Sequence, residues 1–136
     1  MEKLQGYGLF LFRILISARL IWGVQDNILS WDHMIEFEKF LAQHGTPMPL
    51  LGALLSVYTQ FICGILILLG AFIRWASIPL ILNFIAALLI AHRGDSFIGM
   101  FPALTMLAAG VLFLCEGAGK FSIDCYLRAR TSSKLL

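Results

Sequence analysis

Residues 50–69 read LLGALLSVYTQFICGILILL, an apolar stretch that contains no Asp, Glu, Lys or Arg. A helix of this length, at about 1.5 Å per residue, spans about 30 Å, which is the thickness of the hydrocarbon core of a bilayer. The apolar residues do not alternate with polar ones, as they would in a half-buried strand. In lipid, only helices and closed barrels satisfy their backbone hydrogen bonds internally. The stretch therefore predicts a membrane-spanning helix.

The composition of the whole chain is that of a protein dissolved in lipid. Of its 136 residues, 60% are hydrophobic and 13% are charged, whereas soluble domains carry about 25% charged residues. The mean hydropathy is +0.87. A chain of this size has too little interior to hide so much apolar surface from water. The composition excludes a soluble enzyme, and a net charge of +2 gives no reason to expect a nucleic-acid partner.

Three further stretches resemble the first in length and hydropathy. We expect these spans at residues 7–24, 77–92 and 99–115. Thr46 and Ser77 each precede a proline in the pattern of a helix N-cap, so we expect them to begin the second and third spans. Together the spans predict an all-α protein, a four-transmembrane-helix bundle that forms a single membrane domain over residues 1–136.

Between the first two spans, residues 30–44 predict an amphipathic helix that lies in the membrane interface or on the mouth of the bundle. At about 100° per residue, one broad helix face collects the apolar side chains of the segment. These are Trp31, Met34, Ile35, Phe37 and Leu41. Ser30 suits the N-cap position and Gly45 suits the end of the helix. The polar face is mainly acidic, which argues against docking on anionic lipid.

Basic residues are distributed unequally between the two sides of the membrane. Alternating spans place the N-terminus, the loop after the second span and the tail at 117–136 on one side. That side carries Lys3, Arg74, Lys120, Arg128, Arg130 and Lys134. The other side carries only Lys39 and Arg93. Because basic loops remain on the cytoplasmic side, we expect both termini of this multi-pass protein in the cytoplasm.

Polar residues in the spans are the candidate ligand-binding residues. They are Arg13, Ser17, Gln60, Asn83 and His92. An arginine at the centre of a membrane-spanning helix costs about 2.5–3.5 kcal/mol of insertion free energy, so we expect such residues to have a structural or functional role. One interpretation is a shared pocket in which Arg13, Gln60 and Asn83 donate hydrogen bonds to a headgroup such as a quinone ring, with His92 at the outer mouth. The other is interhelical hydrogen bonding that fixes helix register, with Arg13 free to reach the cytoplasmic surface.

The sequence lacks the motifs that would indicate catalysis by this chain alone. The cysteines are three in number and contain no CxxC pair, so thiol–disulfide chemistry has no support. His33 and His44 are too far apart along one helix to share an ion, and no HxxxH pair occurs, so we expect no metal site. The sequence also contains no nucleotide-binding loop. We therefore expect no catalytic activity from this chain alone.

A series of short motifs runs along residues 8–127. The motifs are Arg13-Ile14-Leu15, Gly23 with Asn27, the connector from Phe40 to Pro49, Gln60 to Gly64, Leu69-Gly70 with Arg74, His92, and Gly117 with Phe121 to Asp124. In their order and spacing they resemble the DoxX family of membrane proteins. The resemblance implies a four-helix bundle of the bacterial inner membrane that is accessory to redox metabolism. It also implies an association with quinone and a redox enzyme as the partner, and a second copy of the chain is a further candidate partner.

Three residues depart from the pattern of the family. Gln60 stands where the family often has Glu, Cys63 where it has glycine and Asn27 where it has Lys. Gln60 forms hydrogen bonds but does not titrate. A family activity that moves a proton through that carboxylate would therefore be absent here.

We expect, from the resemblance, a redox-accessory membrane protein that binds a quinone or an apolar small molecule between its helices. Two other functions stay open on the sequence alone. One is a small-solute transporter, and the other is a membrane scaffold or assembly factor that docks a partner through the amphipathic helix.

Overall fold

A computed structural model describes residues 1–135, and every regular element in this range is an α-helix. The helices are α1 (Glu2–Leu29), α2 (Trp31–Gln43), α3 (Pro49–Leu69), α4 (Ile73–Ile90), α5 (Phe97–Glu116) and α6 (Ile123–Lys134). The helices α1, α3, α4 and α5 are long and apolar enough to cross a membrane. The expected all-α bundle with four membrane-spanning helices is thus confirmed. Leu136, the last residue of the expected tail at 117–136, lies outside the described residues.

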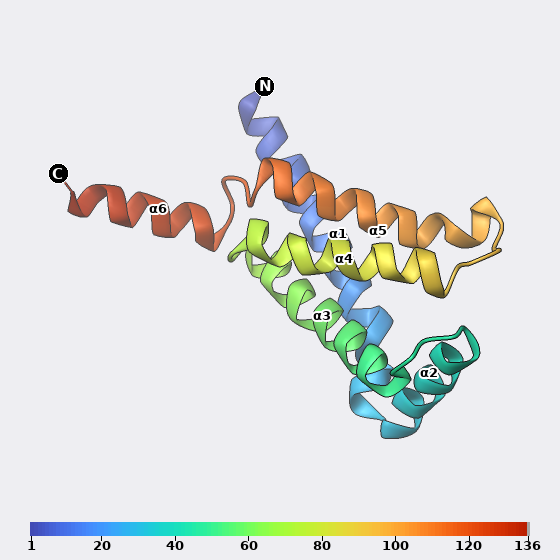
Figure 1. The fold of residues 1–136 in the computed structure, drawn as a ribbon. Coiled ribbons are helices and arrows are strands. Elements are labelled where there is room, and N and C mark those ends of the chain that lie inside the picture. The colour runs from blue at the N-terminus through green and yellow to red at the C-terminus, as the bar shows by residue number, and fades with distance from the viewer. Residues whose placement is uncertain (136) are drawn as a thin grey trace.

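The spanning helices pack as two antiparallel pairs, α1 with α3 and α4 with α5 (Figure 1). Glycine permits close approach within each pair. A Cβ atom on Gly64 of α3 would lie 2.9 Å from Cγ1 of Ile21, and one on Gly110 of α5 would lie 2.9 Å from Cγ1 of Ile81. Helices α3 and α4 meet at the turn between them and diverge toward the opposite end of the bundle (Figure 1).

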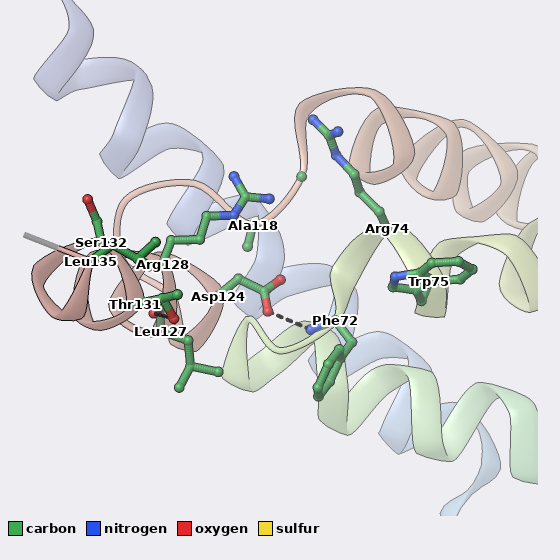
Figure 2. Close-up of a pocket in the computed structure, with 11 residues that line it drawn as sticks. Phe72, Arg74, Trp75, Ala118, Asp124, Leu127, Arg128, Thr131, Ser132 and Leu135 are labelled. Atoms are coloured by element: carbon green, nitrogen blue, oxygen red, sulfur yellow. Dashed lines mark hydrogen bonds between the residues drawn. The ribbon is translucent and has the colours of Figure 1, made fainter.

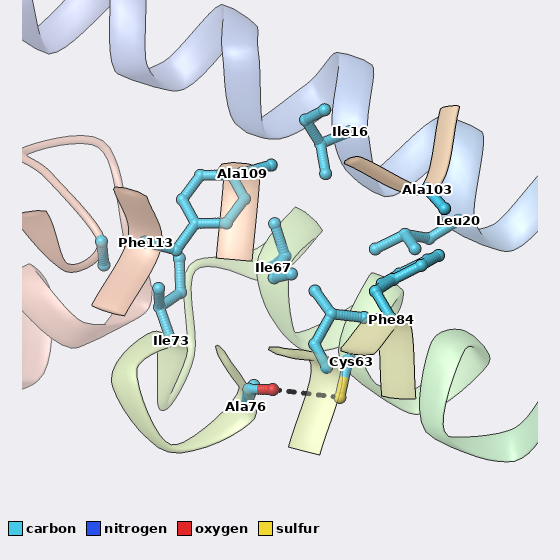
Figure 3. Packing of buried hydrophobic residues seen from close by; sticks show 12 residues of the cluster. Ile16, Leu20, Cys63, Ile67, Ile73, Ala76, Phe84, Ala103, Ala109 and Phe113 are labelled. Atoms are coloured by element: carbon cyan, nitrogen blue, oxygen red, sulfur yellow. Dashed lines mark hydrogen bonds between the residues drawn. The ribbon is translucent and has the colours of Figure 1, made fainter. Parts of the chain in front are cut away.

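Two apolar clusters hold the bundle together. The larger cluster joins all four spanning helices, and Figure 3 shows its side chains converging between them. Its bulkier members are Ile16, Leu20, Ile67, Ile73, Leu80, Phe84 and Phe113. The smaller cluster lies beneath α2 and consists of Val24, Met34, Leu41, Ala53 and Val57. The first cluster therefore fixes the two pairs against each other, and the second fixes α2 against α1 and α3.

Large apolar side chains cover the outside of the bundle. Leu15 on α1, Leu55 on α3 and Leu82 on α4 are all more than half exposed. In each spanning helix only 28% of the apolar window is buried. Soluble monomers rarely expose contiguous apolar surface on this scale. The outward faces are therefore suited to acyl chains, and the bilayer is the environment of this protein.

The amphipathic helix between the first two spans is confirmed as α2. Met34 and Leu41 are buried on its inner face, and Phe37 packs against the same cluster. Trp31 was expected on that face but is 59% exposed. Ser30 occupies the N-cap position, although its side chain makes no capping hydrogen bond.

The second span begins at Pro49, next to the expected range 50–69, but Thr46 is not its N-cap, contrary to the prediction. Helix α3 begins at Pro49, with Met48 in the N-cap position. Pro49 is favourable at the first helical position because its missing N–H would have no partner there. The end was predicted correctly, since Gly70 follows the helix in the left-handed conformation with φ 73°. Thr46 therefore lies in the connector between α2 and α3, where it lines the cavity described below.

The third span begins before Ser77, so that prediction was also wrong. Helix α4 starts at Ile73, and Ser77 Oγ donates to the carbonyl of Ile73 inside the helix at 2.7 Å. The cap is supplied from the far end of the chain. The carboxylate of Asp124 accepts hydrogen bonds from the backbone N–H of Phe72 at 2.8 Å and of Ile73 at 3.2 Å. A contact between residues so distant in sequence is invisible to a local capping pattern.

Candidate functional site

A cavity of about 380 Å³ opens between α3 and α4, toward the end of the bundle where α2 lies. Its walls are mainly apolar and include Phe37, Leu41, Leu55, Leu82 and Ile90. Its polar lining residues are Thr46, Ser56, Thr59 and Asn83. Apolar walls with a few placed polar groups are the usual composition of a small-molecule site. Because Leu55 and Leu82 also belong to the lipid-facing surface, the cavity opens sideways toward the bilayer.

Two residues that line this cavity each carry a polar side-chain atom that is buried without a hydrogen-bond partner. These atoms are Oγ1 of Thr46 and Nδ2 of Asn83, and within residues 1–135 they are the only buried side-chain nitrogen or oxygen atoms in this condition. Leaving such a group unpaired costs about 1–3 kcal/mol. Both residues line the same cavity. A ligand whose oxygen atom accepts from Asn83 and bonds with Thr46 would remove that cost.

Gln60 lies one hydrogen bond away from the cavity. Its Nε2 donates to Oγ of Ser56 at 3.2 Å, and Ser56 lines the cavity while Gln60 does not. The two residues are one helical turn apart on α3. Gln60 therefore orients the Ser56 hydroxyl at the cavity wall.

Arg13 lies away from the cavity, beside the C-terminal end of α3. It is 1% exposed, and its guanidinium donates to four backbone carbonyls. The partners are Ile67 at 3.0 Å, Leu68 at 3.1 Å, Ala118 at 3.0 Å and Phe121 at 2.6 Å. These carbonyls belong to the last turns of α3 and to the loop after α5. The structure thus does not bring Arg13 together with Gln60 and Asn83, because antiparallel packing sets Arg13 beside the end of α3 rather than its middle.

Ser17 and His92 also lie off the cavity lining. Ser17 is fully buried, and its Oγ donates to the carbonyl of Ile14 in its own helix at 3.0 Å. His92 follows α4 directly after Ala91, which does line the cavity. Its Nδ1 is 2.9 Å from Oδ2 of Asp95. Of the five candidate residues, Asn83 lines the cavity, Gln60 bonds to the lining residue Ser56, and His92 follows the lining residue Ala91.

Sequence reasoning missed Thr46 and Ser56 as cavity residues. The sequence pattern favours a helix cap at Thr46 because it precedes Pro47, and Ser56 is not among the candidate binding residues. The only signal in the sequence was that hydroxyl groups occur on an otherwise apolar α3 and in its connector. Which helix face they occupy relative to α4 depends on packing. Across residues 1–135, no group of three His, Cys, Asp or Glu side chains is arranged to hold a metal ion.

The chain is similar to known membrane proteins. The family model described as DoxX matches residues 8–93, which include Arg13, Gln60, Asn83 and the whole cavity lining. The chain belongs to the DoxX family. It is also 26% identical over 123 residues to a protein of Escherichia coli (strain K12) named Inner membrane protein YphA, an alignment that covers 82% of this chain and 88% of that protein. No solved structure matches the chain.

The residues that depart from the DoxX pattern make specific contacts in this member. Sγ of Cys63 donates to the carbonyl of Ala76 at 3.2 Å, which joins α3 to α4. Nδ2 of Asn27 donates to the carbonyl of His33 at 3.1 Å, across the turn between α1 and α2. Gln60 donates a hydrogen bond to Ser56, so each of the three departing residues forms a hydrogen bond in this chain. The family match ends before α5, so the tail that caps α4 lies outside it.

Proposed function

We propose that this DoxX-family protein binds a quinone, or another apolar small molecule with an acceptor oxygen, in the cavity between α3 and α4. In this role it is an accessory to redox metabolism in the inner membrane. The observation that supports the proposal is the pair of unpartnered buried polar atoms, on Thr46 and Asn83, in one apolar cavity. The family membership and a relative named as an inner membrane protein agree with it.

The cavity residues fit a quinone headgroup. The Asn83 amide is a donor that matches a ring carbonyl, and the Thr46 hydroxyl is a second polar partner. The apolar walls suit a ring and an isoprenoid tail, which reaches the bilayer through the sideways opening. A bound quinone would supply reversible two-electron chemistry. This chain would orient the ring and exclude water, and a partner enzyme would carry the reaction, since the sequence contains no CxxC pair or nucleotide loop.

The test is quinone binding to the purified full-length protein and to variants with the cavity polar groups removed. Thr46→Val and Asn83→Leu should each weaken the binding of a short-chain benzoquinone about tenfold, because one hydrogen bond to a desolvated oxygen is lost. Thr105→Val is the matched control, since the Thr105 hydroxyl bonds to the carbonyl of Phe101 away from the cavity. Dissociation constants are measured by titration in detergent micelles and compared between the cavity variants, the control and the wild type.

Two outcomes would overturn this function. If the cavity variants and Thr105→Val bind quinone with the same affinity as the wild type, the cavity is not the quinone site. If quinone does not bind and Asn83→Leu instead abolishes solute uptake into vesicles, the protein is a transporter. Mass spectrometry of the small molecules retained by the purified protein provides an independent check.

We infer that both termini face the cytoplasm. Contacts place the N-terminal segment and the tail at the same end of the bundle, where Lys120 Nζ is 3.8 Å from Glu2 Oε2. That end also holds most of the basic residues outside the spans, and basic segments stay on the cytoplasmic side.

Thiol labelling tests the orientation. Cys115 and Cys125 are exposed at this end, whereas Cys63 is buried. A membrane-impermeant maleimide should label the protein in inverted membrane vesicles and leave it unlabelled in intact cells. A Cys115→Ser, Cys125→Ser variant should remain unlabelled in both. Labelling of the wild type in intact cells would reverse the proposed orientation.

A further inference from the structure

A second hollow, of about 600 Å³, lies between the start of α4 and α6 and is distinct from the cavity described above. Figure 2 shows its side chains, with Arg74 and Trp75 coming from α4 and Arg128 from α6. Aromatic and aliphatic groups complete it, including Phe72 and Leu127. The hollow thus combines two guanidinium groups with an apolar floor.

The charge in this hollow is not balanced by the acid that lines it. Asp124 is engaged with the backbone N–H groups of Phe72 and Ile73 at the start of α4. Within residues 1–135, the ion pairs are His92 with Asp95 and Lys120 with Glu2, so neither Arg74 nor Arg128 has a carboxylate partner. Arg74 Nη2 donates to the carbonyl of Cys115 at 3.2 Å, which leaves its remaining donors available. The hollow therefore presents donors suited to an anion.

The position of the hollow corresponds to the headgroup layer of the bilayer. Trp75, in the first turn of a membrane-spanning helix, is 75% exposed, and Phe72, the N-cap residue of that helix, is 60% exposed. Aromatic side chains of this kind collect at the membrane interface. Helix α6 has no buried residue and extends away from the bundle at this level (Figure 1). Apart from Asp124, the charged residues of α6 are basic, namely Arg128, Arg130 and Lys134.

We propose that the hollow between α4 and α6 binds the phosphate of an anionic phospholipid. Arg74 and Arg128 hold the phosphate, because the planar guanidinium donates two parallel hydrogen bonds to an oxyanion. Trp75 and Phe72 contact the glycerol and the upper part of an acyl chain. The lipid is favoured over free inorganic phosphate because the guanidinium groups stand directly beside exposed aromatic side chains at a membrane boundary. Basic pockets at the end of membrane helices are suited to this chemistry.

The experiment is native mass spectrometry of the full-length protein with phosphatidylglycerol and phosphatidylcholine supplied in equal amounts. The wild type should retain phosphatidylglycerol several-fold more than phosphatidylcholine. Arg128→Gln should lose most of that preference. Arg130→Gln is the matched control, because it removes the same charge from α6 at a position outside the hollow. Arg74→Gln should act like Arg128→Gln, and circular dichroism shows whether it folds.

Three results would overturn the proposal. Equal retention of the two lipids by the wild type would show that the hollow does not select anionic lipid. An equal loss in Arg128→Gln and Arg130→Gln would show attraction by the net charge of α6 alone. Displacement of phosphatidylglycerol by added inorganic phosphate would assign the hollow to a soluble anion. Arg128→Gln keeps the test valid even if Arg74→Gln does not fold, since the Arg128 side chain makes no ion pair within residues 1–135.

Discussion

At the scale of single residues, Arg13 shows how a buried cation is accommodated by backbone carbonyls, since within residues 1–135 it forms no ion pair. The last carbonyls of a helix have no partner within the helix and carry the negative end of its dipole. The Arg13 guanidinium donates to two such carbonyls of α3, those of Ile67 and Leu68. It also donates to Ala118 and Phe121 of the loop after α5. One side chain thus caps α3 and fastens the tail to the bundle.

Replacing Arg13 with Lys should destabilise the protein although it preserves the charge. A single ammonium group cannot reach all four carbonyls, and losing two buried charge-assisted hydrogen bonds costs about 3 kcal/mol or more. Arg19→Lys is the control, because Arg19 is exposed on the same helix. Thermal unfolding in detergent should show a clearly lower Tm for Arg13→Lys only. Equal Tm values for the two variants would mean that the carbonyl contacts contribute little.

Asp124 is the second residue whose role depends on distant partners. Its carboxylate accepts from the N–H groups of Phe72 and Ile73, and its own N–H donates to the carbonyl of Gly70 at 3.0 Å. Phe72 has φ 50°, a left-handed conformation that is uncommon for a residue with a bulky side chain. The Asp124 contacts offset the cost of that conformation. They also compensate for the absence of a local cap at the start of α4.

At the scale of helices, close packing of α1 on α3 depends on the missing side chain of Gly64. A Cβ atom there would lie 2.9 Å from Cγ1 of Ile21 and 3.3 Å from Cβ of Leu20. Both distances are shorter than ordinary carbon–carbon contact at about 3.5–4.0 Å. The two helices would have to separate to admit a larger residue.

Gly64→Val should therefore lower stability by about 1–3 kcal/mol through overpacking. Gly8→Val on α1 is the matched control, because nothing lies within 4 Å of a Cβ at Gly8. Both substitutions carry the same small change in helix propensity, so the difference between their unfolding transitions isolates the packing. If both variants unfold alike, the α1–α3 contact adapts to a larger side chain.

At the scale of the whole molecule, the loop after α5 and Asp124 at the start of α6 bind to the bundle, whereas the rest of α6 extends away from it (Figure 1). Ala118 is buried in the main cluster and its carbonyl accepts from Arg13. Helix α6 has no buried residue. The two parts of the C-terminal segment therefore differ in what they contribute to stability.

Two truncations should separate these contributions. A chain that ends after Cys125 retains Asp124 and the carbonyls that accept from Arg13, so its Tm should stay close to that of the full chain. A chain that ends after Glu116 loses them and leaves the Arg13 guanidinium partly unpaired, which should lower the Tm strongly. Differential scanning fluorimetry in the same detergent measures both. Comparable losses in the two chains would show that α6 itself stabilises the bundle.

The sequence by itself determined the solvent, the number of spanning helices, the amphipathic α2 and the family. The first three follow from patterns within single segments, such as the apolar run at 50–69, because helix formation and insertion into lipid depend on local composition. The family follows from the order and spacing of short motifs along the chain. The start of α4 and the set of polar residues that meet depend on tertiary structure. Asp124 caps α4, Arg13 joins the end of α3, and Thr46 and Asn83 line one cavity because segments separated in sequence lie side by side. Such contacts depend on helix register and crossing, which no local pattern encodes.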